Sequence, residues 1–181
     1  MRPSRIAAVL VCFAVLAGCG TERTTTATPA AQATPSPSGP TSTAEVDVQP
    51  KGGEPALVAA VRFAAHDGYD RVVIDLKGDQ PGYRVEWVDE LVQDGTGEPI
   101  DVKGGAYLQV TLMPANAHTD KGDPTWTGGP VFQANLGNVQ SVVKTGDFEG
   151  HVGVGIVLDH RAGFEVKAQT GPERLVIDVA H

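Results

Sequence analysis

The sequence has little cysteine and, between residues 56 and 181, almost no serine. Its two cysteines are Cys12 and Cys19, and Ser141 is the single serine of that long C-terminal part. If the segment before Cys19 is removed, as argued below, one thiol remains, which excludes a disulfide and a cysteine-ligated metal within the domain. No serine stands in a nucleophile-elbow context, and no histidines form an HExxH pair. We therefore expect no catalytic residue, no metal and no cofactor.

Basic residues are also scarce. The chain has 14 lysines and arginines against 22 aspartates and glutamates, which gives a formal net charge of −8 at pH 7. A chain with this charge repels phosphate backbones and anionic head groups at long range. Nucleic acid is therefore not expected as a partner.

The apolar run at the start of the chain is too short for a membrane span, which needs about 20 apolar residues. It reads IAAVLVCFAVLA, follows Arg2 and Arg5, and ends in small residues. A basic start, a short apolar run and a small-residue cleavage site are typical of a secretory signal peptide. Residues 1–18 are thus expected to be a removable targeting segment.

The residues from Leu16 to Cys19 read LAGC. They resemble the lipobox of bacterial lipoproteins, in which the cysteine takes a diacylglyceryl group and becomes the first residue after cleavage. The resemblance implies that Cys19 is lipidated and anchors the chain on the extracytoplasmic face of the cell membrane. Two acyl chains meet the requirement for stable anchoring. Ordinary secretion with an incidental cysteine is the alternative.

The composition of the remaining chain changes at about residue 55. Residues 19–55 are rich in threonine, proline, serine and alanine and have few large apolar side chains, which predicts a disordered tether. Residues 56–181 alternate apolar and polar positions between glycine, proline and aspartate. Their length suits a single domain.

Period-two alternation within residues 56–181 predicts strands with one buried face. The expected strands include residues 57–63, 72–76, 83–88, 108–112, 139–144, 152–158, 164–168 and 175–179. No comparable stretch has helical periodicity. The expected fold class is therefore all-β, an antiparallel β-sandwich of about eight to ten strands.

Two segments of the domain repeat nearly the same phrase, YDRVVIDL from Tyr69 and PERLVIDV from Pro172. This echo indicates two related β halves, and chance similarity among valine-rich strands is the alternative. Together with PGYRVEWV from Pro81 and GDFEG from Gly146, the phrases resemble the AMIN and AMIN-like family of bacterial cell-envelope proteins. The resemblance implies a β-sandwich accessory module, found in cell-wall amidases and secretin-type complexes, that targets or docks and does not catalyse.

Charged residues of the two echoing strands point away from the expected core. Arg71 and Asp75 lie four residues apart, as do Arg174 and Asp178, which is about 13 Å along a strand and too far for pairing within it. If the two strands are antiparallel neighbours, one register sets Arg71 opposite Asp178 and Asp75 opposite Arg174. Structural pairing across the strands is the first interpretation. The second is a docking surface in which these four residues bind wall polymer or a protein partner.

The segment 114–130 is a long loop that contains Trp126 together with His118, Asp120 and Asp123. Loops of this length are often functional, and an exposed tryptophan could stack on a sugar ring, so Trp126 is the fifth candidate binding residue. One alternative is a solvated loop whose Trp126 closes the end of the core. Another is a cation held by Asp120 and Asp123, which lack the regular oxygen spacing of a calcium loop.

The sequence therefore predicts a non-enzymatic, lipid-anchored module that binds peptidoglycan, a surface glycan or an envelope protein complex. A lipid or lipoglycan carrier is the alternative, and it would need an apolar cavity of several hundred cubic ångströms. A third hypothesis is a hydrolase that uses His118, Asp120 and Asp123, for which the sequence assembles no triad.

Overall fold

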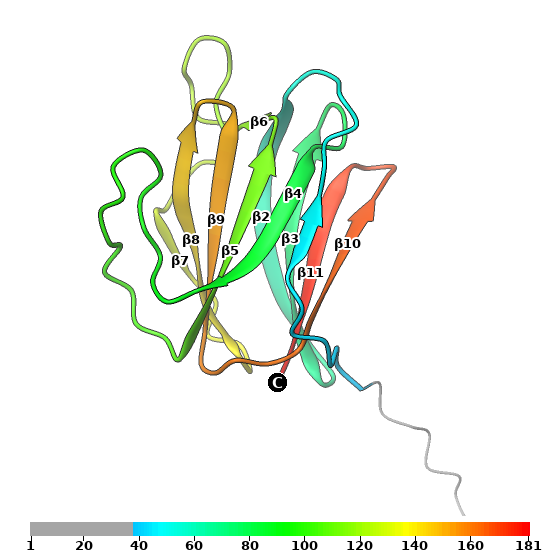
Figure 1. Ribbon diagram of the computed structural model, residues 1–181, viewed down its shortest axis with the longest axis vertical. Coiled ribbons are helices and arrows are strands. Elements are labelled where there is room, and N and C mark those ends of the chain that lie inside the picture. Colours follow the sequence, from blue (N-terminus) through cyan, green and yellow to red (C-terminus); the bar gives the residue numbers. More distant parts are fainter. Residues whose placement is uncertain (1–37) are drawn as a thin grey trace, which may run out of the picture. The chain divides into compact units, whose positions relative to one another are not determined.

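The structure, a computed structural model, describes residues 38–181, and all regular elements in this range are β-strands (Figure 1). In chain order the strands are β1 (Val46–Val48), β2 (Ala56–His66), β3 (Tyr69–Lys77), β4 (Gly82–Val88), β5 (Ala106–Met113), β6 (Ala115–Asn116), β7 (Val131–Gln133), β8 (Val139–Phe148), β9 (His151–Leu158), β10 (Phe164–Gln169) and β11 (Arg174–Ala180). Within these residues no helix is long and apolar enough to cross a membrane.

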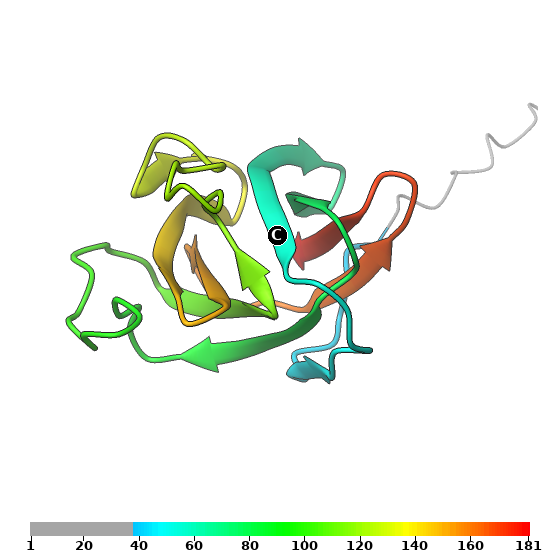
Figure 2. The same ribbon diagram turned by 90° about the horizontal axis from the view of Figure 1, so that it is seen from above.

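The strands form two sheets, and both views of the domain show them as two layers (Figures 1 and 2). One sheet has six strands in the order β1-β4-β5-β9-β8-β7, and the other has five in the order β10-β11-β3-β2-β6. Neighbouring strands are antiparallel except for the short parallel pair β2 and β6. The predicted all-β sandwich is confirmed. It has eleven strands in the described residues, because β1, β6 and β7 are too short for alternation to reveal them.

The core consists of the inward side chains of both sheets. Val72 and Ile74 of β3 are completely buried, as are Leu108 and Val110 of β5 and Ile177 of β11. These residues belong to one hydrophobic cluster that joins the six-stranded sheet to the five-stranded sheet. Since every second side chain of a strand points to the same face, the alternation seen in the sequence accounts for this core.

The segment just before residue 56 packs against the domain, which corrects the predicted tether. Strand β1 pairs with β4. The indole nitrogen of Trp87 donates a hydrogen bond to the carbonyl oxygen of Thr43 (3.0 Å), and the backbone amide of Phe164 donates one to the carbonyl oxygen of Ser42 (2.7 Å). The prediction of disorder across residues 19–55 is therefore wrong for Ser42, Thr43 and β1. The prediction rested on the average composition of the whole segment, in which a three-residue strand does not stand out. The predicted signal peptide, Cys19 and the first part of the tether lie outside the described residues.

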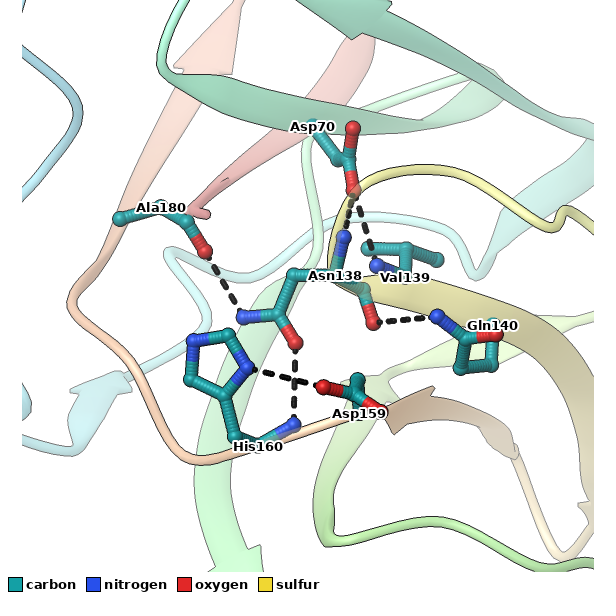
Figure 3. A network of polar contacts seen from close by, with 7 residues as sticks. All are labelled: Asp70, Asn138, Val139, Gln140, Asp159, His160 and Ala180. Atoms are coloured by element: carbon teal, nitrogen blue, oxygen red, sulfur yellow. Dashed lines mark hydrogen bonds and ion pairs between the residues drawn. The ribbon is translucent and has the colours of Figure 1, made fainter.

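A network of polar contacts around Asp70 and Asn138 joins the two sheets at one end of the sandwich (Figure 3). Asp70 is completely buried, and its Oδ2 accepts hydrogen bonds from the backbone amides of Asn138 (2.7 Å) and Val139 (2.8 Å). His181 Nε2 lies 2.9 Å from the other carboxylate oxygen. The Asn138 side chain donates to the carbonyl oxygen of Ala180 (2.7 Å). The network thus ties the start of β8 to the start of β3 and the end of β11.

Part of the outer face of the six-stranded sheet, over β8 and β9, is covered by the segment between β4 and β5, residues 89–105. Leu91 of this segment is buried and packs with Val143 and Val157 in a second hydrophobic cluster. Two glycines of β9 leave room for the cover: a Cβ atom at Gly155 would overlap with the Leu91 side chain, and one at Gly153 would overlap with that of Asp94. The four charged residues singled out in the sequence lie on the other, five-stranded sheet.

Candidate functional site

The four charged candidate residues lie together on the outer face of the five-stranded sheet. Strands β3 and β11 are antiparallel neighbours, with Arg71 opposite Asp178 and Asp75 opposite Arg174. This is the register that the sequence predicted on the condition that the two echoing strands pair. The echo in the sequence therefore corresponds to two adjacent strands of one sheet.

Arg71 and Asp178 form a bidentate ion pair across β3 and β11. Arg71 donates from Nε to one carboxylate oxygen (2.6 Å) and from Nη2 to the other (2.8 Å). Asp178 is buried, and the Arg71 guanidinium also lies over the ring of Tyr69, 5.4 Å from its centre. The hydrogen bond that Arg71 donates to Asp178 raises the pKa of Arg71 despite partial burial. A shielded bidentate pair of this kind stabilises the register, as the structural interpretation predicted.

The second predicted pair, Asp75 with Arg174, does not form. Both oxygens of Asp75 instead accept hydrogen bonds from Arg62 of β2, at 2.6 Å from Nε and 2.8 Å from Nη2. The reason is a β-bulge between Val58 and Ala60, which shifts the alternation of β2 and turns Arg62 to the outer face. The hydrogen bond from Arg62 lowers the pKa of Asp75, and the charge of Arg174 acts in the same direction.

Arg62 is a residue of the candidate site that was not predicted from the sequence. The sequence does contain an indication of its position, because Arg62 is the single charged residue of the expected strand 57–63. A lone charge in an apolar strand indicates a position that faces away from the core. The pairing register of β2, however, depends on the bulge, which the sequence pattern alone did not reveal.

The three arginines Arg62, Arg71 and Arg174 line a groove of about 240 Å³ on this face. Val73 and Val176, which also line it, are almost completely buried although they point away from the core. The two aspartates that pair with arginines here balance two of the three positive charges. The groove is thus a positive spot on a chain whose formal net charge is −8. It can attract an anionic group.

Trp126 does not present an exposed ring, so the prediction that it stacks on a ligand is wrong. Its side chain is 4% exposed and belongs to the main core cluster. The indole stacks on Phe132 with ring centres 5.3 Å apart, and the Lys144 ammonium lies 4.8 Å from the indole centre. Lys144 also donates to the backbone carbonyl oxygens of Trp126 and Gly128. The alternative interpretation, in which Trp126 closes the end of the core, describes the structure.

The other polar residues of the same loop do not come together as a catalytic or metal site. His118 Nδ1 contacts Asp147 of β8 at 2.6 Å, while Asp120 and Asp123 are exposed. Among residues 38–181, no group of three or more histidine, cysteine, aspartate or glutamate side chains is arranged to hold a metal ion. The hydrolase and cation hypotheses gain no support from this geometry.

A second groove lies beside the half-buried ring of Trp87, with Tyr107 and Arg161 among its lining residues. Arg161 already lies over the indole, 4.4 Å from its centre, and the edge of Phe164 packs against the same ring. The face of Trp87 is therefore occupied by the protein itself. We regard the arginine groove as the stronger candidate site.

The interior of the described domain is filled by apolar side chains. The hollows described above open to the surface and have mixed polar and apolar linings. An apolar cavity of the kind that a lipid carrier needs is not among them. The carrier hypothesis therefore has no structural feature in its favour.

The fold and the groove define a β-sandwich module with a surface groove lined by three arginines on its five-stranded sheet. The chain belongs to the AMIN-like family: the family description, AMIN-like domain, matches residues 56–181. Domains of this family are non-catalytic modules that typically bind peptidoglycan or other parts of the cell envelope, which gives the chain an extracytoplasmic, envelope-associated setting. Neither the curated proteins nor the solved structures compared with the chain gave a match.

Proposed function

We propose that this chain is a lipid-anchored, non-enzymatic module that binds peptidoglycan through the arginine groove of its five-stranded sheet. The observation that carries the proposal is the grouping of Arg62, Arg71 and Arg174 around one groove on the outer face of this sheet. Wall peptides carry carboxylates, and a positive groove on an otherwise acidic domain selects for such groups. On the six-stranded sheet, residues 89–105 pack over β8 and β9, and the exposed Arg84 of β4 stands alone beside Asp47.

Charge reversal at Arg62 is expected to reduce retention on purified peptidoglycan sacculi about fivefold or more, because an exposed groove charge changes sign. The measurement is co-sedimentation of the full chain with insoluble sacculi at low and moderate salt. The matched control is Arg84→Glu, since Arg84 is also an exposed strand arginine paired with an aspartate, Asp47, but lies on the other sheet. Its retention should stay within about twofold of the wild type.

Two outcomes of the sedimentation experiment would contradict the proposed function. One is the absence of any retention of the wild-type chain on sacculi. The other is an equal loss of retention in Arg62→Glu and Arg84→Glu, which would mean that net charge alone governs binding. Thermal unfolding of each variant confirms that the fold is kept before the comparison is made.

The anchoring part of the proposal rests on Cys19 and the LAGC segment. When the full chain is expressed in a bacterial host with a labelled fatty acid, the wild type should carry the label and sediment with membranes. Cys19→Ser should lose both properties, because acyl chains provide the anchor. Cys12→Ser is the matched control and should behave as the wild type, since Cys12 lies in the segment that is removed. Label retained on Cys19→Ser would overturn the proposed anchor.

A further inference from the structure

Arg174 differs from the other two arginines of the groove because it holds no carboxylate. Arg62 and Arg71 each bind an aspartate through the same two nitrogens, Nε and Nη2. Asp75 lies opposite Arg174 in the sheet, but both of its oxygens accept hydrogen bonds from Arg62. Among the described residues, the buried Nε of Arg174 has no hydrogen-bond partner.

An unpaired donor of this kind is energetically unfavourable. A buried polar group without a partner loses its hydration without compensation, and the penalty is larger when the group is charged. The nearby Val73 and Val176 are almost completely buried, so water screens this part of the groove poorly. Arg174 therefore carries a positive charge that has lost part of its hydration without gaining an acceptor.

We propose that Arg174 binds a free carboxylate of the ligand in the groove, in the same way that the other two arginines bind aspartate carboxylates. This inference rests on the proposed function, and it assigns recognition to the stem peptides of peptidoglycan, which carry the free carboxylates, and not to its sugar chains. The Nε and Nη2 edge of an arginine already holds a carboxylate twice on this face. Arg174 lines the groove, so a rotation of its side chain turns the same edge toward a bound group.

The test compares three probes on the full chain by isothermal titration calorimetry. The first is a soluble disaccharide tetrapeptide with free carboxylates, the second is the same compound with its carboxylates amidated, and the third is inorganic phosphate. The amidated compound should bind about tenfold more weakly, because it cannot accept a charged hydrogen bond from the guanidinium. Equal affinity for the first two compounds would overturn the inference, as would competition by phosphate at concentrations similar to those of the peptide.

Substitutions of Arg174 test whether this residue binds the carboxylate of the ligand. Arg174→Gln should weaken binding of the free compound about tenfold and remove the preference for it over the amidated compound. Arg174→Lys should also lose affinity, because an ammonium group keeps the charge but not the two-pronged geometry. The control is Lys167→Gln, which removes an exposed positive charge of the same sheet that is paired with Glu165. Its affinity should remain within about twofold of the wild type.

The possible failures are distinguishable from one another. If sacculi retain the wild type but not Arg62→Glu, while Arg174→Gln still prefers the free compound, the groove binds the wall without using Arg174 as inferred. If sacculi do not retain the wild type, the proposed function itself fails. Should Arg174→Gln not fold, the ratio of affinities for free and amidated compounds on the wild type decides the question.

Discussion

Replacement of Trp126 by alanine should lower the free energy of unfolding by about 3–5 kcal/mol, the range for removing a buried tryptophan. The indole is 4% exposed, stacks on the ring of Phe132 and lies beside the ammonium group of Lys144. Its removal leaves a cavity at the end of the core and takes away a cation–π contact of Lys144. Partial burial already lowers the pKa of Lys144, so this ammonium group depends on its remaining contacts.

Urea denaturation of the full chain measures this loss. The control is Phe148→Ala, because Phe148 is a large aromatic residue that is 53% exposed, and its removal should change stability by less than about 0.5 kcal/mol. A Trp126→Ala chain that unfolds at the wild-type urea concentration but no longer binds sacculi would contradict the structure. That result would indicate that the Trp126 ring is exposed and contacts the ligand.

The second large effect is expected for Asp70→Ala, at about 3 kcal/mol. This substitution leaves the buried amides of Asn138 and Val139 without their acceptor, and each unsatisfied group costs about 1–3 kcal/mol. Asp67→Ala is the matched control, since Asp67 is exposed in the turn between β2 and β3. Its stability should stay within about 0.5 kcal/mol of the wild type.

The same residue predicts a dependence of stability on pH. Burial tends to raise the pKa of Asp70, but its hydrogen bonds from two backbone amides and from His181 outweigh burial and hold the pKa below the ordinary value. The stabilisation is therefore complete above the unfolded pKa of about 3.9 and is lost as the pH falls through the lower folded pKa. Urea denaturation between about pH 7 and pH 3 should show this loss in the wild type. If the free energy of unfolding of Asp70→Ala falls just as steeply with decreasing pH, the loss comes from other carboxylates and not from Asp70.

The sequence was sufficient to predict β3 and β11 and their buried faces, and it gave their register on the condition that the two strands are antiparallel neighbours, which the structure shows. Strict alternation places Val72 and Ile74 inward, and for two antiparallel strands a single register determines every opposing pair. The positions of Arg71 and Asp178 followed from that arithmetic alone. Alternation works here because both strands run without a bulge and bury one face against the other sheet.

The sequence was not sufficient where one extra residue or a distant contact decides the outcome. The bulge near Ala59 reverses the faces of β2, and so it determines which arginine binds Asp75. The burial of Trp126 depends on Phe132 and Lys144, which come from β7 and β8. No local pattern around Trp126 reports these contacts.

The sequence of β9 contains a signal for the segment that packs on the outer face of the six-stranded sheet. In β9, Gly153 and Gly155 occupy alternate positions of the phrase HVGVGIVL, on the face that points away from the core. Glycine at alternating outward positions often marks the close approach of another segment. The segment 89–105 is that neighbour, and Leu91 and Asp94 occupy the space that side chains would fill.

The position at which the chain joins the sandwich has a mechanical consequence. Gly39 lies against Gly68 and Ala180, and Pro40 lies against Gly163, so the upstream chain meets the domain at the end that contains the Asp70 network. A pull on the upstream chain would load this end first and would reach both sheets, through β1 to β4 and through Ser42 to β10. The sheet that carries the arginine groove would share that load, and the Asp70 network, which joins the two sheets, would distribute it between them.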